Sequence, residues 1–194
     1  MPVTSCKEAI KKWEQTTGKT PGEATEVKLI ATIPPIDKMD EMLNSFENCQ
    51  KLSLSTNVIE KFIPLPKLKN LKILSLGRNN IKRISSLEEV GASLEELWLS
   101  YNQIEKLDGL APCVRLHTFF LSNNRVRSWE EVPKLAQLPE IKTVLLKRNP
   151  IYAEGKEEQM LENVCQVVKR IPQIETVDGK FVSSAIKAQA EALD

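Results

Sequence analysis

The chain has 194 residues, of which 41% are hydrophobic, so it can bury a substantial core within one domain. Its 27 Lys and Arg residues nearly balance its 26 Asp and Glu residues, which argues against nucleic-acid binding through a generally basic surface. No run of about eighteen apolar residues occurs, so we expect no membrane contact through a spanning helix, and residues 1–13 do not resemble a secretory signal.

The first segment, residues 1–22, is expected to be a capping helix followed by a linker. Ser5 and Glu8 have the spacing of a helix capping box, and apolar residues recur at helical spacing over residues 4–15. The linker contains a Gly-Lys-Thr triplet at residues 18–20 that is similar to the end of a phosphate-binding loop. The glycine that such a loop needs five residues earlier is absent, and no strand precedes the triplet.

Residues 23–48 indicate a degenerate first repeat. Val27 and Leu29 occupy the positions of a short strand, because they lie 25 residues before the equivalent apolar pair Leu52 and Leu54. The sequence Ile-Pro-Pro-Ile at residues 33–36 then replaces the asparagine turn that ends the later repeats.

Residues 49–155 contain a repeating pattern of apolar residues followed by asparagine, with a period of about 22–25 residues. Five windows fit it, beginning at Cys49, Leu71, Leu94, Leu116 and Ile141. This is the spacing of leucine-rich repeats. It predicts an α/β leucine-rich-repeat solenoid, a right-handed superhelix of strands and helical or 3₁₀ turns with a short parallel sheet on its concave face and helical caps at both ends.

One asparagine recurs in each repeat, directly after the strand. We expect its amide to bond backbone groups that the turn leaves unpaired, and to stack on the next asparagine in a structural ladder rather than an active site. The ladder residues are Asn57, Asn79, Asn102, Asn124 and Asn149.

Two C-terminal segments follow the repeats. Residues 156–179 contain an amphipathic helix, with apolar residues from Met160 to Ile171, and a last strand-like turn, and so predict a C-terminal cap. Residues 180–194 are Ala-rich with few apolar residues, and we expect a protruding or disordered tail.

The residues between the inward leucines of each strand should point to the concave face. On three adjacent repeats these positions hold Trp98, Phe120 and Leu145, with Ile73 and Tyr101 beside them. Because neighbouring strands lie about 4.8 Å apart, the side chains should form a continuous apolar patch. We interpret this patch as a protein-binding surface. The alternative is that the terminal helices fold back over it.

Basic residues follow the strands and should line one rim of the solenoid, where they could contact an acidic surface. The rim residues are Arg78, Arg83, Arg125, Arg127, Lys147 and Arg148. A solvated rim without a ligand is the alternative. Aromatic and basic residues largely separate, which argues against single-stranded nucleic acid as the ligand.

Catalytic and metal-ligating candidates are few. The one histidine, His117, lies on an outward position without partners for a triad or a metal site, and the four cysteines are scattered without paired spacing. We therefore expect no enzyme activity, no cofactor and no metal, with the cysteines as buried, reduced thiols of a cytoplasmic protein.

Several strings extend the pattern beyond what the fold requires: IPPIDKMD at 33–40, LSLSTN at 52–57, ILSLGRN at 73–79 and LEELWLSYN at 94–102. With them the chain resembles the leucine-rich-repeat light chain of axonemal outer-arm dynein, in the phosphatase-regulator-like subgroup of these repeats. The resemblance covers nearly the whole chain to Gly179.

This resemblance implies a non-catalytic subunit in the cytoskeleton of a cilium or flagellum, a monomer when isolated. It implies attachment to the motor unit of a dynein heavy chain, at the microtubule-binding tip of the stalk and close to tubulin. The strand face around Trp98 would engage the heavy chain, and the basic rim would face the microtubule. Two alternatives remain open: a phosphatase-regulator-like adaptor for another protein, and a nucleotide-binding protein that uses residues 18–20.

Overall fold

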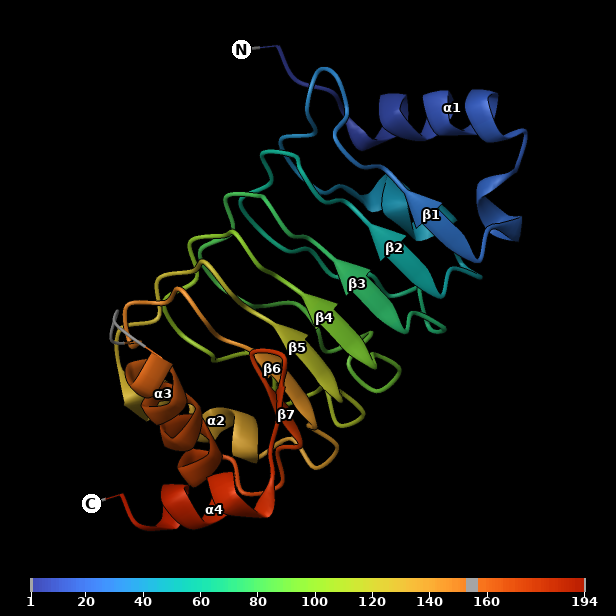
Figure 1. The fold of residues 1–194 in the computed structure, drawn as a ribbon. Helices are drawn as coiled ribbons and strands as arrows, with labels where there is room; N and C mark the ends of the chain where they lie inside the picture. Colours follow the sequence, from blue (N-terminus) through green and yellow to red (C-terminus); the bar gives the residue numbers. More distant parts are fainter. Residues whose placement is uncertain (1, 153–156, 194) are drawn as a thin grey trace.

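The protein is described by a computed structural model that covers residues 2–152 and 157–193. Within these residues, eight strands form one sheet in chain order, and each coil of a curved stack contributes one strand (Figure 1). The strands are β1 (Glu26–Lys28), β2 (Lys51–Ser53), β3 (Ile73–Ser75), β4 (Glu96–Trp98), β5 (Thr118–Phe120), β6 (Thr143–Leu145), β7 (Thr176–Val177) and β8 (Lys180–Phe181). Strands β1 to β7 are parallel, and β8 pairs antiparallel with β7, so the predicted leucine-rich-repeat solenoid is confirmed.

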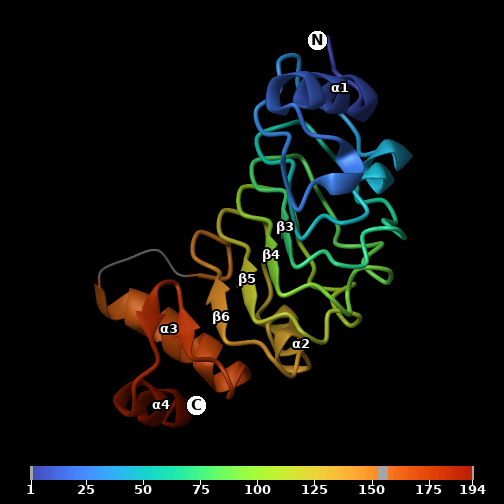
Figure 2. The ribbon, with the colours of Figure 1, turned by 90° about the vertical axis from the view of Figure 1, so that its right-hand side faces the viewer.

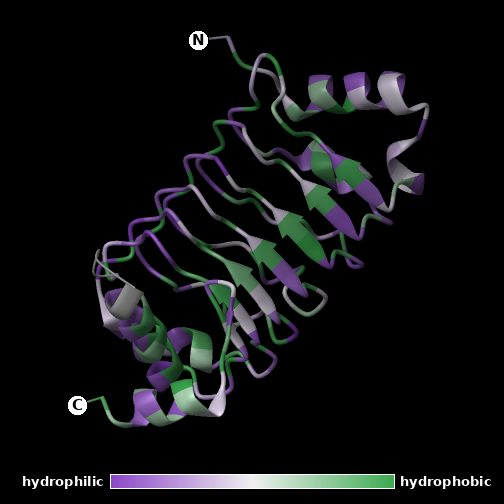
Figure 3. Ribbon diagram, in the orientation of Figure 1, coloured by the Kyte–Doolittle hydropathy of each residue, from purple (hydrophilic) through white to green (hydrophobic). Residues whose placement is uncertain are grey.

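In the three-residue strands β1 to β6, the middle residue points into the stack, and its neighbours on either side point to the concave face, since side chains alternate along a strand. The inward row runs in register through Val27, Leu52, Leu74, Leu97, Phe119 and Val144, all buried. Colouring by hydropathy shows a hydrophobic stretch on strand after strand (Figure 3). The short strand predicted at Val27 is β1, which pairs with β2 at Leu52.

The outer side of the stack is made of turns and short helices, whose apolar residues close each coil. The helices there are η2 (Glu41–Ser45), η3 (Trp129–Glu131) and α2 (Pro133–Ala136). The two apolar columns of this side are buried: Leu65, Leu87, Leu110 and Val132, and then Leu68, Val90, Cys113 and Leu135. Each coil thus buries its apolar residues against its neighbours, which is why the end coils need caps.

Helix α1 (Cys6–Thr17) lies over the N-terminal end of the stack (Figure 2). Ser5 and Glu8 form the predicted capping box. Trp13 packs edge-on against Phe46, with ring centroids 5.3 Å apart. Gly18 ends the helix in the left-handed conformation, at φ +68°, and the short helix η1 (Pro21–Glu23) follows.

The C-terminal cap begins with α3 (Glu157–Arg170), whose predicted apolar face is largely confirmed. Val164, Val167, Val168 and Ile171 are buried. Met160 lies outside this face and is 55% exposed. The last turn of the cap is β7, as predicted.

The expectation of a protruding or disordered tail after residue 179 was wrong. Strand β8 doubles back on β7, and α4 (Ser184–Glu191) packs against α3. The Ser183 hydroxyl caps α4 by accepting a bond from Ile186 N, and Val182 and Ala190 are buried. The small apolar residues of this segment are enough to form a packed helix, because alanine favours the helical conformation and its short side chain lets α4 pack against α3. The division into five segments at 22, 48, 155 and 179 stays a prediction. In the described ranges, no helix has the length and apolar character needed to cross a bilayer.

Candidate protein-binding face

The ladder asparagines are structural. In each of the five, the Nδ2 group donates to a carbonyl of its own turn and to one of the preceding coil, and Oδ1 accepts an amide of the preceding coil. For Asn102 the partners are Leu99 O at 3.0 Å, Leu76 O at 2.9 Å and Ile81 N at 2.9 Å. The coils are therefore tied through the backbone, and this buried amide has its polar atoms fully occupied.

The three central residues of the predicted patch lie side by side. Trp98, Phe120 and Leu145 are in register on β4, β5 and β6, and each is partly exposed. The rings of Trp98 and Phe120 stack with centroids 5.8 Å apart and an interplanar angle of 24°. They form a flat aromatic surface that continues into Leu145.

Polar groups hold Trp98 at the edge of this surface. Its Nε1 donates to Glu96 Oε2 at 2.9 Å, and Lys51 Nζ lies 5.7 Å from the centroid of the indole ring. Ile73 lies in the next row, in register between Lys51 and Glu96. The patch thus has an apolar centre and a charged border, the composition typical of a protein interface.

Small residues floor the neighbouring part of the concave face. Ser53 and Ser75 occupy the same row as Trp98 but are buried, and Ser75 Oγ lies 2.7 Å from Ser55 Oγ. Ser122 donates to the Ser100 hydroxyl at 3.0 Å in the next row. The hydrogen-bonding groups of these serines are paired with one another. Because serine side chains are short, they leave room beside the indole ring of Trp98 for a partner's side chains.

The terminal helices do not cover this face. Helix α1 lies beyond β1, and α3 and α4 lie beyond β6, so strands β3 to β5 are open to the viewer in Figure 1 and free of helices in the turned view (Figure 2). The alternative of terminal helices folded back over the strands that carry Ile73, Trp98 and Phe120 is therefore not what the structure has.

One exposed aromatic residue of this face was missed by the sequence analysis. Phe181 on β8 is 72% exposed and lies opposite Thr176 of β7, so both side chains are on the same face of the sheet. Asp178 and Gly179 form the two-residue turn between these strands, both with positive φ. An Asp-Gly pair between short apolar runs is a hairpin signal, and it could have predicted β8.

Tyr101 contacts a residue of the predicted basic rim. It is 41% exposed in the turn after β4, and the Arg78 guanidinium carbon lies 4.3 Å from its ring centroid. Tyr101 and Arg78 occupy equivalent left-handed positions of adjacent coils, with φ of +61° and +56°. The stacking keeps Arg78 extended along the rim.

The rest of the basic rim is divided. Arg83 and Arg125 line a hollow of about 610 Å³ together with Lys82 and Lys106. Two acids, Glu105 and Asp108, also line it. A hydrogen bond from Lys134 Nζ at 2.7 Å pairs the Asp108 carboxylate and holds its pKa below its usual value. The other predicted rim residues, Arg127, Lys147 and Arg148, are exposed outside this hollow.

Neither metal binding nor thiol chemistry has a site in the part of the chain that the structure describes. No three His, Cys, Asp or Glu side chains there are grouped to hold a metal ion. Burial raises the pKa of Cys113 to about 12, and that of Cys6 to about 11, so these thiols stay protonated.

The Gly-Lys-Thr triplet at residues 18–20 does not form a phosphate-binding loop. Gly18 closes the C-terminal end of α1, where its N–H donates to Glu14 O. A phosphate loop instead leads from a strand into the N-terminus of a helix, where free N–H groups and the positive end of the dipole bind the anion. The triplet has the opposite placement.

Comparison with known proteins identifies the same repeat and several similar proteins that share one name. The family model described as Leucine Rich repeats (2 copies) matches residues 92–134. The chain is similar to "Dynein axonemal light chain 1" of Homo sapiens, 50% identical over 91% of this chain and 92% of the relative. The proteins of that name from Xenopus laevis and Chlamydomonas reinhardtii are 49% and 44% identical, over 99% and 97% of this chain and 97% and 96% of theirs.

Solved structures agree on the fold. A leucine-rich-repeat protein of Leptospira interrogans has a TM-score of 0.55 at 22% identity, over 73% of this chain and 34% of that one. An internalin from Listeria monocytogenes has a TM-score of 0.54 at 17% identity, over 90% and 54% of the two chains.

Proposed function

Since this chain belongs to the dynein axonemal light chain 1 family, we propose that it is a non-catalytic light chain of the outer dynein arm, in the axoneme of a cilium or flagellum. The proposed partner is an axonemal dynein heavy chain, bound at the microtubule-binding tip of its stalk. By binding there, the light chain modulates the interaction of the motor with microtubules and so affects motility.

The concave face around Trp98 is the proposed heavy-chain surface. The observation that supports it is the in-register row of Trp98, Phe120 and Leu145, which is apolar and partly exposed. The strands of Trp98 and Phe120 are free of the terminal helices. Nothing in the repeat requires large apolar residues there, because Ser75 and Ser53 fill the same row one and two strands before Trp98. Buried aromatic anchors contribute much of the binding energy of protein interfaces. Phe181 extends the same face.

The basic rim is the proposed microtubule-facing edge. Arg83 and Arg125, with their lysine neighbours, would lie against the acidic surface of tubulin. An attraction of this kind weakens as salt rises, because exposed charges are screened over about 8–10 Å at physiological ionic strength.

The test is heavy-chain capture from ciliated cells by purified wild-type and variant proteins. Phe120→Asp and Trp98→Ala should each reduce the captured heavy chain at least tenfold, a loss of about 1.4 kcal/mol or more. Val114→Asp is the control, because Val114 is 48% exposed but is not on the concave face. Undiminished capture by both folded variants would refute this binding surface. Recovery of a phosphatase subunit without any motor would instead favour the adaptor function.

A further inference from the structure

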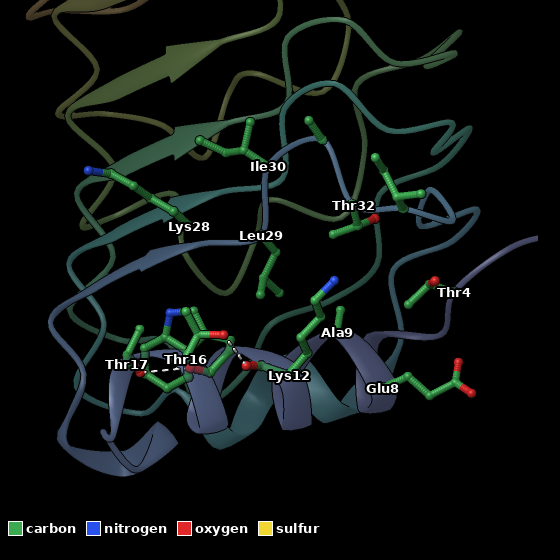
Figure 4. Close-up of a pocket in the computed structure, with 13 residues that line it drawn as sticks. Thr4, Glu8, Ala9, Lys12, Thr16, Thr17, Lys28, Leu29, Ile30 and Thr32 are labelled. Atoms are coloured by element: carbon green, nitrogen blue, oxygen red, sulfur yellow. Dashed lines mark hydrogen bonds between the residues drawn. The ribbon is translucent and has the colours of Figure 1, made fainter.

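A groove separates α1 from the first coil, at the N-terminal end of the sheet (Figure 4). It encloses about 470 Å³. One wall is the inner side of α1, and the other is the segment from Lys28 to Ile33 that continues β1. The groove therefore runs along the outer edge of the first strand rather than across the concave face.

That strand edge carries backbone groups that the sheet does not use. Leu29 N donates to Ser53 O at 2.8 Å, and Ala31 N donates to Ser55 O at 3.1 Å. Since alternate residues of a parallel strand point their N–H and C=O groups in opposite directions, those of Lys28 and Ile30 point away from β2. Within the described residues, the backbone of Ile30 makes no hydrogen bond.

The chain itself pairs with the first coil a few residues further on, after the left-handed residue Ala31 (φ +50°) has turned it away from β1. Thr4 N donates to Pro35 O at 2.9 Å, and Thr4 forms a parallel bridge with Ile36. The open end of the first coil is therefore bonded by an extended segment beyond this turn. Between Lys28 and Ile33 the structure has no such segment, and the open groove takes its place.

The side chains around the groove favour an apolar and acidic occupant. Ile30 is 45% exposed and Ile33 is 86% exposed, although both are large and apolar. Lys12 extends from α1 toward the first coil in Figure 4, and no described carboxylate lies within 4.0 Å of its ammonium group. The carboxylate of Glu8 is occupied by Ser5, whose N–H and hydroxyl bond it at 3.0 and 2.9 Å.

We propose that this groove binds an extended peptide segment of a partner protein, which adds a strand to the free edge of β1. Its backbone would bond the outward groups of Lys28 and Ile30, its alternate apolar side chains would cover Ile30 and Ile33, and an acidic side chain would face Lys12. Main-chain bonds would provide affinity, and the apolar and acidic positions would provide selectivity. The site is separate from the concave patch and does not depend on the heavy-chain assignment.

The experiment starts from random twelve-residue peptides displayed on phage and selected on the full-length protein. We expect enriched sequences with alternating apolar residues and an acidic residue. One enriched peptide is then synthesised, and its affinity is measured for wild type, Ile30→Asp, Lys12→Glu and the control Val114→Asp. Ile30→Asp and Lys12→Glu should each weaken binding about tenfold or more. Val114→Asp should bind as wild type does, because Val114 does not line the groove.

Two measurements distinguish strand addition from simple apolar contact. The amides of Lys28 and Ile30 should gain protection from hydrogen exchange when the peptide binds, whereas those of Leu29 and Ala31 are already protected by β2. A peptide with alternate backbone nitrogens methylated on its bonding edge should lose affinity. The proposal would be overturned if selection on wild type enriched no peptide that the Ile30→Asp protein fails to enrich. It would also be overturned if the amides of Lys28 and Ile30 gained no protection from hydrogen exchange when the peptide binds. Retained binding by Trp98→Ala would show that the groove acts independently of the concave face.

Discussion

The asparagine ladder predicts a specific cost for Asn102→Ala. This side chain is 7% exposed and makes three bonds. The two carbonyls that it contacts keep a second amide partner, because Asn79 also bonds Leu76 O and Asn124 also bonds Leu99 O. The Ile81 N–H loses its side-chain partner and stays buried. An orphaned buried amide costs about 1–3 kcal/mol, and each lost but replaceable bond about 0.5–1.5 kcal/mol. The expected loss of unfolding free energy is therefore about 2–6 kcal/mol.

Urea unfolding, followed by both circular dichroism and tryptophan fluorescence, measures this loss. Coincident transitions from the two probes would justify a two-state free energy for this repeat protein. Asn70→Ala is the matched control, because Asn70 is exposed in a turn, and it should change stability by less than about 0.5 kcal/mol. A loss below about 1 kcal/mol for Asn102→Ala, or one equal to that of the control, would refute the view that the ladder holds adjacent coils together.

Two further changes test the cap and the buried thiols. Asp178 Oδ1 accepts hydrogen bonds from Leu146 N and Lys147 N, and Oδ2 accepts one from Tyr152 OH at 2.6 Å. Asp178→Ala should therefore lower the unfolding free energy by at least about 2 kcal/mol in the same urea assay. An unchanged midpoint of urea unfolding would contradict this. Burial raises the pKa of Cys49 from about 9 to about 11 and that of Cys113 to about 12. The unfolded thiols therefore ionise first, so stability that is fully present below about pH 9 should decline as the pH rises from 9 to about 12. Cys113→Ala should make this decline of unfolding free energy with pH shallower. A slope equal to that of wild type would contradict the view that the buried Cys113 thiol contributes to it.

The inward positions could be predicted from the sequence because the fold dictates them. A repeat of about 22 residues returns the chain to the same place, so each leucine of the pattern must fill the same interior layer and each asparagine the same turn. The concave positions could also be predicted, since a three-residue strand leaves its two outer side chains on one face. This is why Trp98 and Phe120 were expected to be adjacent, as they are.

The parts that could not be predicted depend on how the ends of the stack are finished. The Asp178-Gly179 hairpin and the packing of α4 on α3 use weak local signals, and only the tertiary contact of Val182 and Ala190 makes them stable. Tyr101 was predicted to flank the patch as a concave spacer, and the sequence pattern did not foresee that its left-handed backbone places its ring against Arg78. The groove beside β1 arises from the placement of α1, which no repeat pattern specifies.

A solenoid separates the residues that maintain its fold from those that are free to bind. Inward leucines and ladder asparagines recur because every coil must meet its neighbours, so they carry little information about a partner. The outward row has no such constraint. Its change from buried Ser53 and Ser75 to Trp98, Phe120 and Leu145 therefore has no explanation in the packing of the coils. Variants in this outward row should change partner binding and leave the unfolding free energy nearly unchanged. Variants in the asparagine ladder should lower the unfolding free energy and leave the binding residues of the concave face unchanged.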